Sequence, residues 1–182
     1  MRIAWLLLLA AFTVPAGLSA QEQERVVRQL SFVGNKALDD ETLASVIATT
    51  NSSIGTFFLL RWLGLGEKRY LNEVEFRRDV VRLLLQYRQS GYMNAVVDTV
   101  VRRTRREAYI EFRIHEGEPV RVTRLEVTGV EGIFNVEKLK KDLPLHVGDP
   151  FNRFQLQASA DTIVGRLRNN GFPYAEVLRN FD

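Results

Sequence analysis

The sequence contains no cysteine, and this absence excludes several kinds of chemistry. Across 182 residues there is no thiol to form a disulfide, to act as a thiolate nucleophile or to bind zinc. The two histidines, His115 and His146, lie far apart in the sequence, and neither has a second ligand at the spacing that metal sites use. The signatures of phosphate-binding loops, dinucleotide sites and serine hydrolases are also missing. These absences predict a protein that is not an enzyme and that needs no cofactor.

A strong excess of one charge is lacking too. The 25 lysines and arginines exceed the 22 acidic residues by little, and the formal net charge is +3. Such a small excess does not indicate nucleic-acid binding. With 46% hydrophobic and 26% charged residues, the composition is that of a folded globular protein.

The sequence has one long apolar run, and it lies at the N-terminus. Residues 3–14 follow the positive Arg2, and Ala20 supplies a small residue for cleavage. A transmembrane helix needs about 20 apolar residues, so this run is short for a membrane span. The pattern predicts a secretory signal peptide over residues 1–20. The alternative is an uncleaved N-terminal anchor.

The rest of the chain contains an internal repeat. The segment 71–97 aligns with 151–177 at a shift of 80, and the segment 30–34 aligns with 125–129 at a shift of 95. The difference between the shifts places an insert of 15 residues in the first copy, around residues 56–68. We therefore predict two repeats, over residues 24–117 and 118–182.

Each repeat begins with alternating polar and apolar residues, which predict a strand with one buried face, near residues 30–33 and 125–128. Two helices follow in each copy. The second helix ends at a glycine, and an asparagine with an acid or amide three residues later predicts a capping box at its start. These pairs are Asn72 with Glu75 and Asn152 with Gln155.

Two further alternating segments close the first repeat. They predict strands near residues 94–103 and 108–116, joined by a turn that carries four arginines. The order of elements is therefore β-α-α-β-β. The second copy shows only the first strand, the two helices and the start of one more strand at 175–178, so we expect the second repeat to be incomplete.

This order of elements resembles that of POTRA domains, and the resemblance covers residues 24–178. It implies an α+β fold of tandem POTRA repeats, each a three-stranded mixed sheet covered by two helices. The residues that carry the resemblance lie where elements begin or end, and we interpret them as structural. They are Gly34, Asn35, Gly91, Tyr92, Glu116, Gly117, Gly129 and Gly171.

The best-known proteins with such repeats are BamA-like outer-membrane assembly factors. The resemblance implies a periplasmic module that is associated with the outer membrane and binds polypeptides. Its partners would be unfolded outer-membrane protein clients and accessory periplasmic lipoproteins, without nucleic acid. The membrane itself would be reached through a C-terminal β-barrel that is missing from this sequence. The alternatives are the POTRA region of a two-partner-secretion transporter and an FtsQ-type division scaffold, which requires an uncleaved anchor.

The resemblance also implies that the strand near 94–103 lies at an edge of the sheet, beside a central strand near 108–116. An exposed edge can bind an extended client through main-chain hydrogen bonds. The alternative is an edge that only faces water. The residues expected to form this edge are Ala95, Val97, Thr99 and Val101.

The insert of the first repeat places large apolar side chains in a predicted loop. Such side chains predict a patch for a partner, and the alternative is that they cover the helix pair. The residues of this patch are Phe57, Phe58, Leu60, Trp62 and Leu63. The arginines of the hairpin turn are interpreted as a solvated tip, with contact to anionic lipid headgroups or an acidic partner as the alternative.

Overall fold

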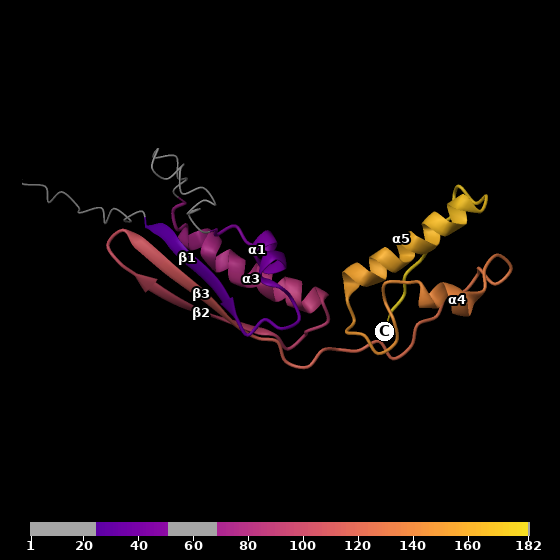
Figure 1. Ribbon diagram of the computed structural model, residues 1–182, viewed down its shortest axis with the longest axis horizontal. Helices are drawn as coiled ribbons and strands as arrows, with labels where there is room; N and C mark the ends of the chain where they lie inside the picture. Colours follow the sequence, from indigo (N-terminus) through magenta and orange to yellow (C-terminus); the bar gives the residue numbers. More distant parts are fainter. Residues whose placement is uncertain (1–24, 51–68, 182) are drawn as a thin grey trace, which may run out of the picture.

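The computed structural model describes residues 25–50 and 69–181. The predicted signal peptide and the predicted patch of the insert lie outside these residues. The first repeat contains β1 (Val26–Val33), α1 (Asp40–Val46), α3 (Glu73–Gln89), β2 (Val96–Arg103) and β3 (Glu107–His115), and the second contains α4 (Val136–Lys141) and α5 (Arg153–Asn169) (Figure 1). Among the helices of the described residues, none has the length and hydropathy needed to cross a membrane.

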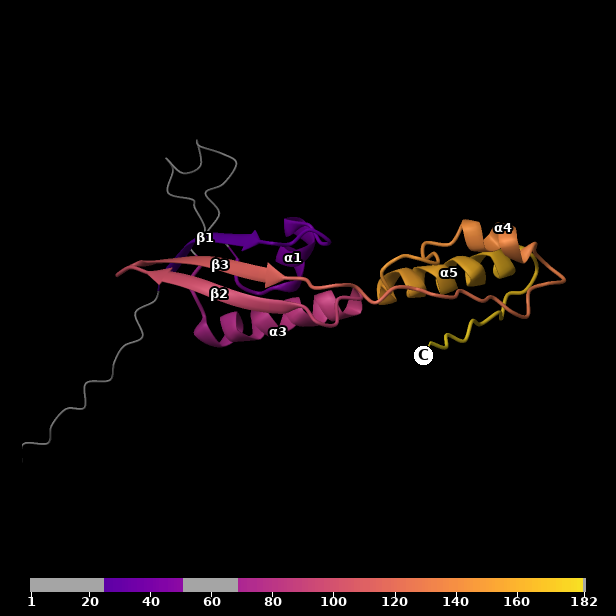
Figure 2. The ribbon, with the colours of Figure 1, turned by 90° about the horizontal axis from the view of Figure 1, so that it is seen from below.

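The first repeat forms a three-stranded mixed sheet in the order β1-β3-β2. The central strand β3 is parallel to β1 and antiparallel to β2. Helices α1 and α3 lie on one face of this sheet, and the strand order can be followed from β1 to β2 in Figure 2. The predicted α+β fold and the order β-α-α-β-β of the first repeat are confirmed.

The core lies between this sheet and its helices. Alternate residues of β3 are buried, and the ring of Phe112 stacks on Phe32 at 5.6 Å and lies 5.7 Å from Phe76 of α3. In β1 the register shifts between Val27 and Gln29, so Val27 lies opposite Ala108 and Leu30 opposite Ile110. This irregularity lets two residues three positions apart face the same core, which strict alternation does not allow.

A buried carboxylate joins the two helices of the first repeat. Asp79 of α3 is fully buried, and its two carboxylate oxygens accept hydrogen bonds from the backbone N–H groups of Ala48 and Thr49 at 2.8 and 2.9 Å. Arg82, one turn further along α3, also donates to Asp79 and to Glu75. Asp79 therefore fixes the chain just after α1 against the middle of α3.

The second helix of each repeat begins as the sequence predicts. The Asn72 side chain accepts hydrogen bonds from the N–H groups of Val74 and Glu75, and Asn152 caps α5 in the same way. The Glu75 carboxylate, which a capping box would direct back to the cap, instead binds Arg78 and Arg82. The reciprocal half of the predicted capping box is wrong at Glu75 because two guanidinium groups compete for its carboxylate, and charge-assisted bonds are stronger than a bond to an amide.

Two carboxylates are expected to make the fold less stable at acid pH. Hydrogen bonds from Thr42 hold the pKa of the Asp39 carboxyl, which caps α1, below its usual range, and Arg82 and Arg78 lower the pKa of Glu75 in the same way. Because the unfolded chain takes up these protons at a higher pH, both carboxylates stabilise the fold above their unfolded pKa values. We expect the urea midpoint to be level from pH 7 to about pH 5 and to fall below about pH 4.5.

The control for this pH dependence is the double variant Asp39→Asn with Glu75→Gln. Asparagine still caps a helix, so the variant removes the titrating groups and keeps the cap. Its urea midpoint should fall less steeply between pH 5 and pH 3 than that of the parent chain. An equal slope for both proteins would assign the acid sensitivity to other carboxyl groups.

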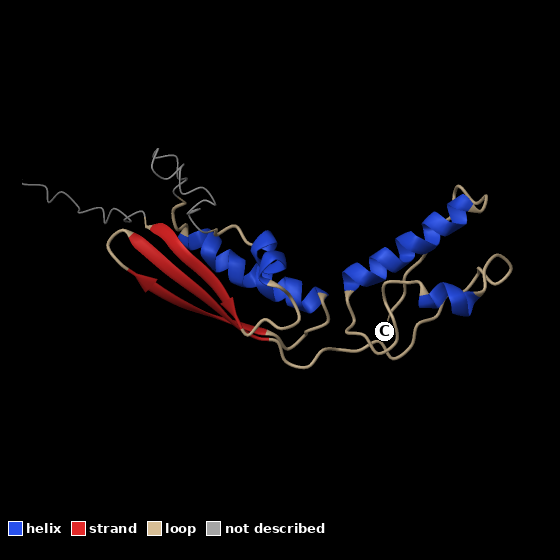
Figure 3. Ribbon diagram, in the orientation of Figure 1, coloured by secondary structure: helices blue, strands red, loops and turns tan. Residues whose placement is uncertain are grey.

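The second repeat contains two helices but no strand among the described residues 118–181 (Figure 3). The predicted strands near 125–128 and 175–178 are therefore wrong as strands. Their apolar side chains nevertheless pack on the helices in the predicted alternation, from Leu125, Val127, Ala175 and Val177. A groove separates the two segments. They lack a ladder because the counterpart of β3, which pairs with both neighbours in the first repeat, does not occur in residues 118–182.

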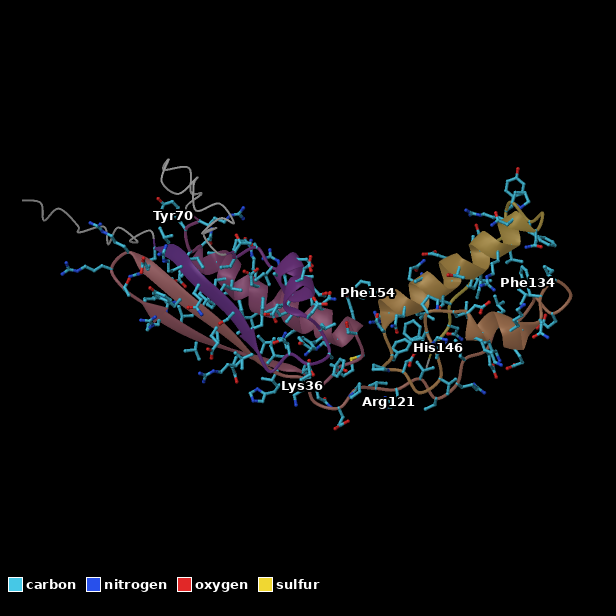
Figure 4. The ribbon with its side chains drawn as sticks, viewed as in Figure 1. Lys36, Tyr70, Arg121, Phe134, His146 and Phe154 are labelled. Atoms are coloured by element: carbon cyan, nitrogen blue, oxygen red, sulfur yellow. The ribbon has the colours of Figure 1, made fainter. Side chains whose placement is uncertain are left out.

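One main-chain hydrogen bond connects the two repeats, and further hydrogen bonds hold the adjoining chain of the second repeat in place. The N–H of Val120 donates to the carbonyl of Gly91 at 2.9 Å, and the N–H of Phe151 donates to the carbonyl of Val120 at 2.7 Å. Gly91 has φ +94°, and a Cβ added there would lie 2.9 Å from the Phe151 carbonyl oxygen. Arg121, labelled in Figure 4, also donates to the Gly148 carbonyl at 2.9 Å. Gly91 thus ends α3 and provides the space for the chain that enters α5.

Candidate functional site

The outer side of β2 is an open edge of the sheet. Among residues 25–50 and 69–181, β2 pairs only with β3, along its whole length from Val96 to Arg103. The opposite edge, formed by β1, is partly closed, because Val26 forms a bridge with Tyr70 and Val27 donates to the Arg69 carbonyl at 2.9 Å. Of the two edges of the sheet, β2 therefore offers the longer free row of backbone groups. We call this row the free edge.

The alternation of hydrogen-bonded and non-hydrogen-bonded pairs between β2 and β3 determines which backbone groups the free edge presents. The N–H of Thr104 donates to the Glu107 carbonyl at 2.9 Å, which makes this closing pair a hydrogen-bonded pair. Hydrogen-bonded and non-hydrogen-bonded pairs alternate along an antiparallel ladder. The residues of β2 in non-hydrogen-bonded pairs, whose N–H and C=O groups point away from β3, are thus Val97, Thr99, Val101 and Arg103.

The side chains at the predicted edge positions mostly face the core. Val97 is only 8% exposed and Val101 is half-buried, whereas Thr99 is exposed. Ala95 is buried and precedes the first residue of β2. The free edge therefore presents the main-chain groups of Val97, Thr99 and Val101. Ala95 belongs to the buried core of the first repeat. The sequence prediction missed Arg103, whose place in the ladder gives it the same backbone direction.

Two arginines anchor the C-terminal end of β2 to neighbouring side chains. The Arg103 guanidinium binds both carboxylate oxygens of Glu73 on α3 at 3.2 Å. On the outer face of the sheet, the guanidinium of Arg102 stacks over the ring of Tyr109 at 4.0 Å. Both contacts fix the strand where it enters the turn, so the free edge keeps its extended shape without a partner strand.

The predicted Glu116–Gly117 motif forms a latch at the other end of the sheet. One oxygen of Glu116 accepts hydrogen bonds from the N–H groups of Lys36 and Ala37 at 2.7 and 2.8 Å and from the Tyr87 hydroxyl at 3.2 Å. Burial, and then the charge of Glu116, raise the pKa of Tyr87, so its hydroxyl stays protonated as a donor. The latch joins the ends of β3 and α3 to the loop after β1.

The remaining motif residues lie at turns, as expected from their positions. The Asn35 amide donates to the Leu38 carbonyl at 3.0 Å and to Asp40 at 2.7 Å, which shapes the loop before α1. The ring of Tyr92 meets Tyr87 edge-on at 6.0 Å, just after the end of α3. A positive φ occurs at Gly34, Gly91, Gly117, Gly129 and Gly171.

In residues 25–50 and 69–181, no group of three or more potential ligands could hold a metal ion.

Comparisons with known proteins agree with this architecture. A family profile described as "POTRA: Surface antigen variable number repeat" matches residues 26–117 and 120–181. Two relatives, each an outer membrane protein assembly factor BamA, are 24% identical to the chain over 168 and 157 residues. They come from Neisseria meningitidis serogroup B (strain ATCC BAA-335 / MC58) and Neorickettsia risticii (strain Illinois), and the alignments cover 91% and 86% of this chain. The chain spans 20% of the length of each relative.

Two solved structures are also similar to the chain. The crystal structure of Haemophilus influenzae BamA POTRA3-5 is 20% identical and has a TM-score of 0.44, with 87% of this chain and 61% of that chain covered. The N-terminal domain of Omp85 from the thermophilic cyanobacterium Thermosynechococcus elongatus is 15% identical and has a TM-score of 0.36, with 79% and 55% covered.

Proposed function

Because this chain belongs to the POTRA family, we propose that its first repeat binds extended polypeptide segments by strand addition at the free edge of β2. The clients would be unfolded outer-membrane proteins, and accessory periplasmic lipoproteins would be further partners. The module would act in the periplasm as part of an outer-membrane protein assembly factor, in a binding role and without catalysis. The relatives named as BamA assembly factors support this assignment.

The observation that carries the proposal is the row of backbone groups on β2 that pair with no other residue in the described part of the chain. Four residues direct an N–H and a C=O away from β3, and an added strand could pair with all of them. Pairing through the main chain depends little on the side chains of the client, which suits a protein with many clients. The charged residues on β2, among them Asp98 and Arg102, oppose indiscriminate pairing with apolar strands.

The test is the double variant Val97→Pro with Thr99→Pro in the full chain. Proline removes the amide donor, and at these two positions the lost donors face the free edge and not β3. With each hydrogen bond contributing about 1 kcal/mol, we expect roughly a ten-fold loss or more in crosslinking to a urea-unfolded outer-membrane β-barrel protein. Circular dichroism would establish that the variant is folded.

A matched control is Val97→Ala with Thr99→Ala. This variant loses side-chain packing at the same two positions but keeps both N–H groups. Its crosslinking yield should stay within about two-fold of the parent, since the main-chain donors remain. Strand addition at β2 would be wrong if the folded proline variant and the alanine variant captured the client equally well.

A further inference from the structure

Arginines from three segments meet at the end of the first repeat that lies farthest from the second repeat. Segments 25–28, 69–73 and 102–107 contain seven arginines and two glutamates. Their backbones are joined, because Val26 donates to the Arg106 carbonyl and Leu71 to the Arg25 carbonyl. We call these three segments the basic end. Its excess of positive charge is larger than the formal net charge of +3 of the whole chain.

Within the basic end, some arginines are held in place while two project freely. Arg103 is bound to Glu73, Arg102 lies on Tyr109, and Arg28 approaches Glu107 at 3.8 Å. Arg105 and Arg106 form the turn between β2 and β3 and are exposed. Among the described residues, neither has an ion pair or a side-chain hydrogen bond. The turn therefore presents two unpaired guanidinium groups, and the arginines beside it that are held in place add further positive charge.

We propose that the basic end binds the anionic phospholipid headgroups of a membrane surface. Guanidinium groups donate in a planar fork that matches phosphate oxygens, and several of them raise affinity for an anionic surface together. The basic end also carries Tyr70, which is 50% exposed and labelled in Figure 4, and tyrosines favour the level of lipid headgroups. The proposal does not rest on strand addition at the free edge.

The shape of the basic end favours a surface over a single acidic polypeptide. The β2–β3 turn lies at one extremity of the described chain (Figures 1 and 2), and Arg105 and Arg106 within it are exposed. A turn at an extremity can touch a flat array of phosphates with Arg105 and Arg106 together, whereas a polypeptide would require contacts arranged along a line. The orientation that follows places the strands end-on to the membrane and the second repeat away from it.

The experiment measures binding of the full chain to phosphatidylcholine vesicles with and without phosphatidylglycerol, by flotation at about 0.1 M salt. We expect binding only to vesicles that contain phosphatidylglycerol. Each basic residue near an anionic surface contributes roughly a five-fold gain in affinity, so Arg105→Gln with Arg106→Gln should weaken binding roughly 25-fold. The control Lys138→Gln with Lys141→Gln removes the same charge from exposed positions of α4 and should change binding by less than about three-fold.

Competition separates the sources of anionic charge. Inorganic phosphate should release the chain no better than chloride at equal ionic strength, because a membrane surface offers many phosphates at once. Preferential release by phosphate would indicate a site for the free ion and would overturn the proposal. The proposal is also wrong if the chain binds polyglutamate but not anionic vesicles, or if the Arg105→Gln, Arg106→Gln variant floats like the parent. Circular dichroism of the variant checks that the hairpin is intact.

Discussion

Replacing Asp79 with alanine should destabilise the first repeat by roughly 2–4 kcal/mol, because two backbone N–H groups lose the buried carboxylate that accepts from them. The substitution leaves the N–H groups of Ala48 and Thr49 buried without their acceptor and deprives Arg82 of one of its two carboxylates. A domain of this size is stable by about 5–15 kcal/mol, so the loss is a large part of the total. Urea unfolding followed by circular dichroism measures it.

One further variant separates the charge of Asp79 from its hydrogen bonds, and a second is a control at the surface. Asp79→Asn keeps the volume and one carbonyl acceptor, so it should retain one of the two backbone bonds and lose less stability than alanine. Asp98→Ala removes a carboxylate from an exposed position of β2 and should cost no more than about 0.5 kcal/mol. A loss at Asp79→Ala as small as that at Asp98→Ala would contradict the role assigned to the buried carboxylate.

Gly34→Ala should also weaken the first repeat strongly, by roughly 2–5 kcal/mol. Gly34 has φ +90°, which an L side chain rarely adopts, and an added Cβ would lie 2.2 Å from the Ile114 carbonyl oxygen. The backbone of β3 would have to move to admit the methyl group, and this shift would disturb the latch that Glu116 forms just beyond it. The free energy of unfolding of the full chain, measured in urea, gives the cost.

The matched comparison is Gly117→Ala in the same repeat. Gly117 also has a positive φ, +70°, but an added Cβ would lie 3.5 Å from the nearest atom, in Asn94. That variant should cost only the conformational strain, about 1–2 kcal/mol. Equal losses at the two glycines would mean that φ alone decides and that the close approach to Ile114 has no effect.

The sequence was sufficient to predict the elements of the first repeat because their signals are local. Alternation identified the buried faces of β2 and β3, and Asn72 and Asn152 marked the helix starts by a hydrogen bond to residues two and three positions away. The register irregularity after Val27 had no local signal. Asp79 was missed for the same kind of reason, since its partners lie about 30 residues away and an acid within an amphipathic helix usually faces water.

The strands of the second repeat show what a local signal cannot predict. Alternation at Leu125 and Val127 correctly indicated which side chains pack inward, but a strand also requires a neighbour in the ladder. The position of the free edge was expected from the family resemblance and not from the residues of β2. The residues whose backbone groups point outward are Val97, Thr99, Val101 and Arg103. They could be identified only from the hydrogen bond that closes the hairpin at Thr104.

The junction at Gly91 has a mechanical consequence. A hinge built from side chains could swing while each unit stayed intact, but here the carbonyl that follows α3 holds Val120, and Val120 in turn holds Phe151. Tilting one unit against the other must therefore strain the bond between Gly91 and Val120 or change the close approach of Gly91 to the Phe151 backbone. These contacts therefore limit tilting at this point and couple the end of α3 to the start of α5.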